Sequence, residues 1–316
     1  MIGSLYLKKQ NKMANVSVVM CCYNAEAHIR ESIDSVLRQS FTDFEFIIWD
    51  DGSTDGTREI VQSYKDARIY YYYHENTGLG QALRLSCEKA SAPIIARMDA
   101  DDICEPTRLQ EEYDYLQSHP ESVLVSSAVN YIDEDGTFLR RSLPYTDSRV
   151  IKKLLLTTGQ SVVVHPSTMF RKDAYVKAGG YMPLRKAQDI ALFSRMCKLG
   201  RFYTFKKPLL NYRLAVDSIT TQTQDSSYLL IINAYLRKFS SDDEILLEDV
   251  DRYNEIVMLS KREIQKKDIK KLNSSRFTKS VDVRLYNIFK VILGGSIASW
   301  VIISLRNVGA RIKYKV

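Results

Sequence analysis

The stretch Ile94-Ile-Ala-Arg-Met-Asp-Ala-Asp-Asp-Ile103 joins an apolar run directly to the carboxylates of Asp99, Asp101 and Asp102. Such a run predicts a buried strand, and the residues just beyond its carboxyl end lie where open α/β sheets bind ligands. Carboxylates crowded there repel one another unless a hard divalent cation such as Mg²⁺ or Mn²⁺ neutralises them, usually together with a substrate's phosphates. For an isolated Asp-x-Asp pattern, a solvated acidic loop that caps the next helix is the alternative.

Strand-like and helix-like patterns alternate along the chain before this stretch. Short apolar runs predict strands, and apolar residues at helical spacing predict the helices between them. This alternation predicts an α/β fold, with a mostly parallel sheet and helices on both faces. The expected strands are Val16–Met20, Phe44–Trp49, Arg68–Tyr73 and Ile94–Met98, and the expected helices are Ala25–Gln39, Asp55 or Thr57 to about Tyr64, and Gly80–Ala90.

The alternation continues beyond the carboxylates to about residue 225, after which the pattern turns helical, polar and basic. We expect a leader over residues 1–14, a main domain over 15–225 and a helical basic C-terminal region over 226–316, with Met1 or Met13 as the start. The further expected helices are Pro106 to about His119, Ser148–Leu156 and Gln188–Leu199, and the further strands are Val123–Val129, Phe138–Arg141, Ser167–Arg171 and Phe202–Phe205.

The net charge of +7 comes largely from the C-terminal region, where basic residues crowd between Lys261 and Arg276 and again from Arg306 onward. The apolar segment Val291–Leu305 is shorter than the ~20 residues that cross a bilayer core. Two hypotheses stay open for this segment: it forms an interfacial helix on anionic lipid, or it forms a helix packed on the main domain. We expect no nucleic acid among the partners.

The five cysteines form no C-x-x-C pair and show no spacing typical of zinc or of a disulfide framework. The first fourteen residues lack the apolar core of a signal peptide. Both observations favour a cytoplasmic protein, and the basic C-terminal region suggests peripheral contact with the inner face of the cell membrane.

A second acidic pair, Asp50 and Asp51, follows the second expected strand. Capping of the next helix explains one carboxylate there, but not two side by side. A carboxylate at this position can accept a base N–H or ribose hydroxyls, and Tyr23, after the first strand, could stack on the same base. The chain has no glycine-rich dinucleotide or P-loop motif, so a cation must carry much of any phosphate charge.

Five motifs in this order resemble family 2 glycosyltransferases of the GT-A fold, a Rossmann-like α/β fold, over about residues 15 to 220. The resemblance implies that the main domain is a GT-A catalytic domain, followed by a helical extension. The motifs are Val16-Ser-Val-Val-Met-Cys-Cys-Tyr-Asn24, Asp50-Asp-Gly-Ser-Thr-Asp55, Asn76-Thr-Gly-Leu79, Ile95-Ala-Arg-Met-Asp-Ala-Asp-Asp-Ile103 and His165-Pro-Ser-Thr-Met-Phe-Arg171.

The resemblance implies that a nucleotide-diphosphate sugar is the donor substrate. Asp51 would recognise the donor's base, Tyr23 would stack on it, and Asp50 is a weaker candidate beside them. Asp99 and Asp101 resemble the metal-binding D-x-D pair, with Asp99 also near the nucleotide and Asp101 in direct contact with Mn²⁺ or Mg²⁺. Asp102 ranks third, as a metal ligand, a ribose contact or a helix cap.

The resemblance also implies a general base for inverting transfer to a hydroxyl of a glycan or lipid-linked acceptor in surface polysaccharide biosynthesis. Asp189 holds that place, with an N-cap as its alternative role. Gln188 stands where the family usually has Glu, which bears on acceptor binding more than on catalysis. Further candidates near the acceptor or diphosphate are His165, Arg171 and Tyr212-Arg213.

Two alternatives to a hexosyl- or N-acetylhexosaminyltransferase stay open. One is a family member that binds a sugar nucleotide without turnover. The other is a phosphatase like the haloacid dehalogenases, which also needs Asp-x-Asp after a strand. In that class the nucleophile lies near the start of the domain, whereas Asp99 follows three other expected strands.

Overall fold

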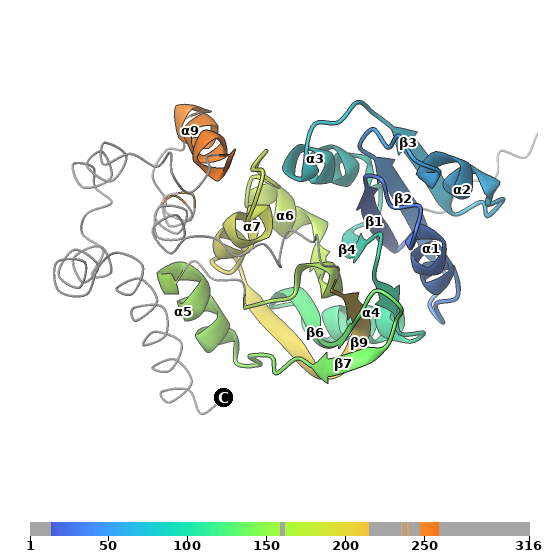
Figure 1. The fold of residues 1–316 in the computed structure, drawn as a ribbon. Helices are drawn as coiled ribbons and strands as arrows, with labels where there is room; N and C mark the ends of the chain where they lie inside the picture. Colours follow the sequence, from blue (N-terminus) through green and yellow to red (C-terminus); the bar gives the residue numbers. More distant parts are fainter. Residues whose placement is uncertain (1–13, 159–161, 215–234, 236–238, 240–246, 259–316) are drawn as a thin grey trace, which may run out of the picture.

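The computed structural model describes residues 14–158, 162–214, 235, 239 and 247–258. The described part of the chain contains one nine-stranded sheet in the order β3-β2-β1-β4-β8-β6-β9-β5, with β7 paired to β6 (Figure 1). The strands are β1 (Val16–Cys22), β2 (Phe44–Asp50), β3 (Ile69–Tyr73), β4 (Ile94–Asp99), β5 (Ile103–Cys104), β6 (Ser122–Ile132), β7 (Phe138–Arg141), β8 (Met169–Arg171) and β9 (Arg201–Arg213).

Helices connect the strands and cover the sheet. They are α1 (Ile29–Leu37), α2 (Thr57–Ser63), α3 (Leu79–Lys89), α4 (Arg108–Ser118), α5 (Ser148–Thr158), α6 (Lys172–Lys177), α7 (Gln188–Met196) and α9 (Leu247–Met258), with a 3-10 turn at His165–Ser167. The first four strands in the sheet order run parallel, β8 runs antiparallel to β4 and β6, and β9 runs parallel to β6. The sheet is therefore mostly parallel, as the sequence predicts.

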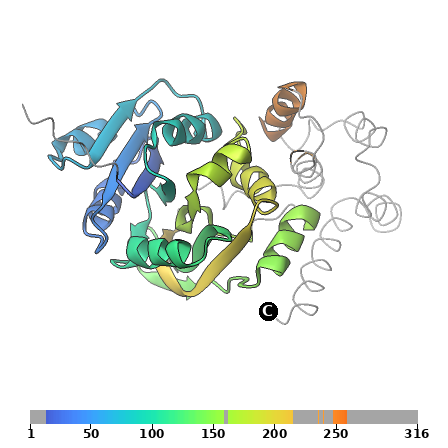
Figure 2. The same cartoon turned by 180° about the vertical axis from the view of Figure 1, so that it is seen from behind.

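Two hydrophobic cores, one on each face of the sheet, explain this layering. Side chains alternate along β1, so that Val18 and Met20 pack with α1, α2 and α4, while Val19 and Cys21 pack with α3, α5, α6 and α7. Figure 1 shows α3 on one side of β1 to β3 and α1 with α2 on the other, and Figure 2 shows the same separation from behind. The predicted α/β fold with helices on both faces is confirmed.

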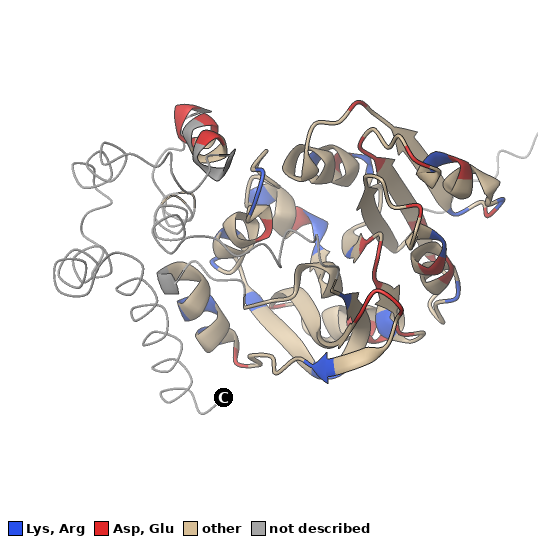
Figure 3. Ribbon diagram, viewed as in Figure 1, with Lys and Arg blue, Asp and Glu red and all other residues tan. Residues whose placement is uncertain are grey.

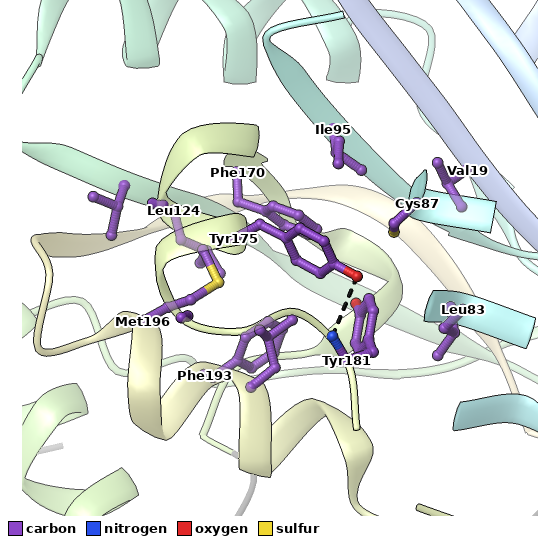
Figure 4. Packing of buried hydrophobic residues seen from close by; sticks show 14 of the residues in the cluster. Val19, Leu83, Cys87, Ile95, Leu124, Phe170, Tyr175, Tyr181, Phe193 and Met196 are labelled. Carbon is purple, nitrogen blue, oxygen red and sulfur yellow. Dashed lines mark hydrogen bonds between the residues drawn. The ribbon is translucent and has the colours of Figure 1, made fainter. Parts of the chain in front are cut away.

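The second core is rich in aromatic rings. Figure 4 shows Tyr175 of α6 and Tyr181 beside Cys87 of α3, with Phe193 of α7 nearby. The Tyr175 hydroxyl accepts a hydrogen bond from the Tyr181 N–H at 3.2 Å. This packing joins α3, α6 and the segment that leads into α7. All five cysteines of the chain are buried and reduced.

Strand β9 is much longer than the predicted strand Phe202–Phe205. Lys206, Lys207 and Pro208 interrupt its apolar pattern, so the sequence gives no sign that the strand continues to Arg213. The sheet accommodates Pro208 opposite Ala128, where the register between β6 and β9 shifts. The short elements β5 and α6 are also absent from the prediction.

The expected boundary near residue 225, residues 1–13 of the expected leader over 1–14, and the segment Val291–Leu305 lie outside the described residues. Of the expected helical C-terminal region, the structure describes α9 and the two residues Tyr235 and Phe239, which pack on α9 through Tyr253. Among the described residues, no helix has both the length and the apolar character needed to span a membrane.

Candidate active site

The carboxyl ends of three parallel strands meet at one edge of the sheet. Cys22 at the end of β1 lies opposite Asp50 at the end of β2, and Cys21 lies opposite Asp99 at the end of β4. The two acidic pairs that the sequence singles out therefore begin at the same edge. Figure 3 shows acidic residues on the loop that follows β4 and on the loop that joins β6 to β7.

Asp50 is completely buried and its carboxylate is bound within the protein. Its Oδ1 accepts the N–H of Ser53 at 2.8 Å, and its Oδ2 accepts the hydroxyl of Tyr71 at 2.7 Å. Burial, followed by the hydrogen bond to Asp50, raises the pKa of Tyr71, which keeps this hydroxyl a donor. Both carboxylate oxygens contribute to the fold, and we assign Asp50 no ligand.

Asp51 is buried beneath the loop between β3 and α3. Its Oδ1 accepts the Thr77 N–H at 3.0 Å and the Thr77 hydroxyl at 2.9 Å, and its Oδ2 accepts the Gly78 N–H at 2.8 Å. The loop can come this close because Gly52, with φ +87, has no Cβ; an added one would lie 2.8 Å from the Asn76 nitrogen. A carboxylate offers about four lone-pair sites, so Asp51 keeps capacity for one more donor.

Tyr23 lies on the turn after β1 with 53% of its side chain exposed. The next residue, Asn24, has φ 49 and is fixed to the loop after β2, since its N–H donates to Ser53 Oγ and its Oδ1 accepts the Thr54 N–H. An exposed ring on a turn fixed in this way can stack on a flat ligand next to the Asp51 loop. The predicted role of Tyr23 is compatible with this placement.

The second acidic group consists of Asp99, Asp101 and Asp102, and we call it the β4 cluster. One carboxylate oxygen of each lies within 4.8 Å of the others. Burial, then repulsion from Asp99, raises the pKa of Asp101 to about 6. Burial, then repulsion from Asp101 and Asp99, raises the pKa of Asp102 well above its ordinary value. Negative charge is therefore held here at an electrostatic cost.

The hydrogen bonds of the β4 cluster do not offset that cost. The buried guanidinium of Arg97 forms an ion pair with Asp99. Asp102 Oδ1 accepts the Arg213 N–H at 2.9 Å, while its buried Oδ2 has no hydrogen-bond partner within the described part of the chain. A buried carboxylate oxygen without a donor is unfavourable by itself. Three converging carboxylates, one with an unpartnered oxygen, fit a hard divalent cation, which prefers oxygen ligands.

Asp102 is not a helix cap, because the residue before α4 is Thr107. The capping alternative for Asp189 is also wrong, since Ala187 is the N-cap of α7 and Asp189 lies in the first turn. A carboxylate in the first turn faces the positive end of the helix dipole. The start of α7 is fixed by close packing: an added Cβ on Gly80 of α3 would lie 2.3 Å from the Leu184 carbonyl oxygen.

A buried polar group lies between Asp189 and the β4 cluster. His165 Nε2 and the Tyr181 hydroxyl are 2.6 Å apart in a hydrogen bond. Burial, then Arg97, lowers the pKa of His165, so its imidazole is neutral. Burial is the main cause of the raised pKa of Tyr181, to which Asp189 also contributes. Asp99 and Tyr181 both contribute to the raised pKa of Arg97, so Arg97 interacts electrostatically with both groups.

Two of the further candidates have structural partners. Arg171 donates to the carbonyls of Ser122 and Leu116 and pairs with Ile94, at the start of β4 and away from the site. Arg213, in contrast, contacts the β4 cluster directly. The sequence contains both arginines but shows no difference between them, because their acceptors lie far away along the chain.

Comparisons with known proteins agree with this fold. A model of the family described as glycosyl transferase family 2 matches residues 17–179, more than half of the chain. The O-antigen biosynthesis glycosyltransferase WbnJ of Escherichia coli is 32% identical over 232 residues, which cover 71% of this chain and 88% of that protein. The amylovoran biosynthesis glycosyltransferase AmsE of Erwinia amylovora is 29% identical over 189 residues, covering 58% of this chain and 70% of that protein.

Solved structures share the fold at low sequence identity. S. aureus TarS in complex with UDP-GlcNAc superposes with a TM-score of 0.64 at 15% identity, covering 93% of this chain and 92% of that one. The mannosyltransferase PcManGT from Pyrobaculum calidifontis, in complex with GDP-Man and Mn²⁺, gives a TM-score of 0.50 at 18% identity, covering 78% and 70%. This chain belongs to glycosyltransferase family 2 and has the GT-A fold.

Proposed function

We propose that this glycosyltransferase is metal-dependent and inverting, and that it transfers a hexosyl or N-acetylhexosaminyl group from a nucleotide-diphosphate sugar. The acceptor would be a hydroxyl of a glycan or lipid-linked acceptor in surface polysaccharide biosynthesis. The observation that carries the proposal is the β4 cluster, with its raised carboxyl pKa values and the unpartnered oxygen of Asp102. Such a cluster suits a donor whose diphosphate shares a cation with it.

The proposed donor site extends from Tyr23 and Asp51 to the β4 cluster along the edge of the sheet. Tyr23 would stack on the base and Asp51 would accept from it. Asp101 and Asp102 would hold Mn²⁺ or Mg²⁺, together with Asp99, which Arg97 orients through an ion pair. When bound, the cation supplies positive charge for the departing diphosphate.

Asp189 would act on the acceptor side. The acceptor hydroxyl oxygen forms a bond to the anomeric carbon while the bond from that carbon to the diphosphate oxygen breaks. The hydroxyl proton passes to the Asp189 carboxylate, and the nucleoside diphosphate leaves with the electron pair of the broken bond. The configuration at the anomeric carbon is thereby inverted in a single displacement.

The relatives support the proposed pathway class, since WbnJ and AmsE are named for O-antigen and amylovoran biosynthesis. A lipid-linked acceptor would suit the basic C-terminal region expected from the sequence. We therefore propose a cytoplasmic enzyme in peripheral contact with the inner face of the membrane. Family membership removes the support for the phosphatase alternative.

The donor is identified by measuring nucleoside diphosphate release across a panel of sugar nucleotides with Mn²⁺, with Mg²⁺ and with EDTA. We expect slow hydrolysis of one donor that needs the cation. Release from no donor, although one of them binds, would favour a family member without turnover. Equal release in EDTA would contradict the metal-dependent mechanism.

Asp189→Asn tests the general base. The amide cannot accept the acceptor proton, so transfer should fall by about 10²- to 10⁴-fold while the affinities for donor and Mn²⁺ stay the same. Isothermal titration and a coupled assay of diphosphate release measure the two quantities. The matched control is Gln188→Asn, which changes the preceding position without removing a carboxylate. Retained turnover in Asp189→Asn would remove this residue from the base role.

A further inference from the structure

Arg213, the last residue of β9, is an almost completely buried arginine, 3% exposed, beside the β4 cluster. It pairs with Ile132 at the end of β6, and β5, which directly follows Asp102, pairs antiparallel to β9 at Asn211. The end of β9 therefore lies between the metal-binding loop and the turn that follows β6. A charge buried at such a junction needs several partners.

The side chain of Arg213 binds three separate segments. Its Nε donates to the Asp101 carbonyl at 2.9 Å, its Nη1 donates to the carbonyls of Asp133 and Glu134 at 3.1 and 2.6 Å, and its Nη2 contacts Glu31 Oε2 at 2.6 Å. Glu31 belongs to α1, and the two carbonyls belong to the β6–β7 turn. The planar guanidinium thus holds the loop, the helix and the turn in one fixed arrangement.

The main chain of Arg213 acts on the same loop. Its N–H donates to Asp102 Oδ1, which fixes that carboxylate, and the other oxygen, Oδ2, has no hydrogen-bond partner among the described residues. From α1, the Ser32 hydroxyl contacts the carbonyls of Ala100 and Asp102. The carboxylates therefore lie on a loop that hydrogen bonds from α1 and from β9 hold before any cation binds, and Arg213 provides the bonds from the end of β9.

We infer that Arg213 is the positioning residue of the metal site: it presets the Asp101 and Asp102 carboxylates and thereby sets the affinity for the divalent cation. The inference rests on the proposed metal site, and it assigns Arg213 no contact with donor or acceptor. Residues that orient metal ligands in this way typically change metal affinity by about 10- to 100-fold when substituted.

Arg213→Lys is the informative variant. A lysine keeps the positive charge and the main-chain N–H, but its single ammonium cannot reach the Asp101 carbonyl, Glu31 and the β6–β7 turn at once. Arg171→Lys is the matched control, since Arg171 likewise donates to main-chain carbonyls, of Ser122 and Leu116, but lies at the other end of β4. Both substitutions remove a guanidinium fork and keep the charge.

The experiment measures Mn²⁺ affinity of the full chain, without donor, from the electron paramagnetic resonance signal of free Mn²⁺. Unfolding temperatures in EDTA report any loss of stability. We expect a dissociation constant raised about 10- to 100-fold in Arg213→Lys and unchanged in Arg171→Lys, at a temperature where both are folded.

The outcomes separate the inference from the proposed function. Unchanged Mn²⁺ affinity in Arg213→Lys, or an equal loss in both variants, would overturn the positioning role and leave the metal site in place. If the unmodified chain does not bind Mn²⁺, the metal site itself is wrong and the inference fails with it. Arg213→Gln, which also removes the charge, should bind Mn²⁺ no better than Arg213→Lys; better binding would contradict positioning by the guanidinium.

Discussion

Two acidic clusters lie at the same edge of the sheet, and their carboxylates have opposite surroundings. After β2, Asp50 and Asp51 accept five hydrogen bonds, from Ser53, Tyr71, Thr77 and Gly78. After β4, Asp102 keeps a buried oxygen without a donor, and the pKa of Asp101 is raised to about 6. The position of a carboxylate at a strand end therefore does not determine its task.

The supply of N–H and O–H donors makes the difference. The loop after β2 turns tightly at Gly52, which brings the amides of Thr77 and Gly78 onto Asp51. The loop after β4 brings three carboxylates together but turns few amides toward them. The first cluster stabilises the fold without a ligand, whereas the second would be stabilised by the proposed cation. Substitutions in the two clusters should therefore have opposite effects on stability.

The largest expected effect is that of Asp101→Asn. Loss of a ligand should weaken Mn²⁺ binding by at least about 100-fold and transfer by a similar factor. In EDTA the same change relieves repulsion from Asp99, so the free energy of unfolding should rise by roughly 1–3 kcal/mol. Titration with Mn²⁺ and urea unfolding check the two parts. If Asp101→Asn is less stable in EDTA than the unmodified chain, repulsion among the carboxylates of the β4 cluster does not destabilise the fold.

Asp51→Asn should lower the free energy of unfolding by roughly 1.5–3 kcal/mol, since the amide turns an N–H₂ toward a donor of Thr77 or Gly78. Its Mn²⁺ affinity should stay that of the unmodified chain. Urea unfolding in EDTA and Mn²⁺ titration measure both. If Asp51→Asn and Asp101→Asn shift stability in the same direction, the contrast between the clusters is lost.

The smallest expected effect is on the pH dependence of stability. The pKa of Asp101 in the folded protein is raised from 3.8 to about 6. Its contribution to the free energy of unfolding is therefore complete below about pH 3.8 and is lost as the pH rises toward 6. Burial acts to raise the pKa of Asp55, in the loop after β2, but hydrogen bonds from Thr57 and Glu26 outweigh it, so the pKa is lowered. Its contribution is present above pH 3.8 and lost as the pH falls.

Urea unfolding in EDTA between about pH 2.5 and 7 separates the two contributions. Asp101→Asn should remove the fall in stability toward pH 6, which is at most about 1.4 kcal/mol per pH unit. Asp55→Asn should reduce the loss of stability in acid. An unaltered pH profile in either variant would refute the corresponding pKa direction.

Much of the fold follows from local patterns, and the parts that do not have a common cause. The parallel strands β1, β2 and β4 are predictable because each is an apolar run that is buried on both faces. Strand β5 has only two residues and exists because Ile103 pairs with Asn211, more than a hundred positions later. The extension of β9 past Pro208 depends in the same way on its partner strand.

The candidate site shows the same limit. The spacing of Asp99 and Asp101 after a buried run predicts a metal pair only together with the other motifs, and the pair stays a prediction. The hydrogen bonds that hold the Asp50 and Asp102 carboxylates could not be predicted from the sequence. They come from Tyr71 and Arg213, whose contacts with these carboxylates arise only when the sheet forms.

The burial of every cysteine has a practical consequence. Burial raises the pKa of the Cys21 and Cys197 thiols to about 11 and that of Cys87 to about 12, so at neutral pH these sulfurs are protonated and shielded from solvent. A cysteine placed at Tyr23, which is 53% exposed, would be the thiol that a maleimide dye reaches first. Tyr23→Cys should thus allow single-site fluorescent labelling beside the proposed donor site without prior removal of the native cysteines.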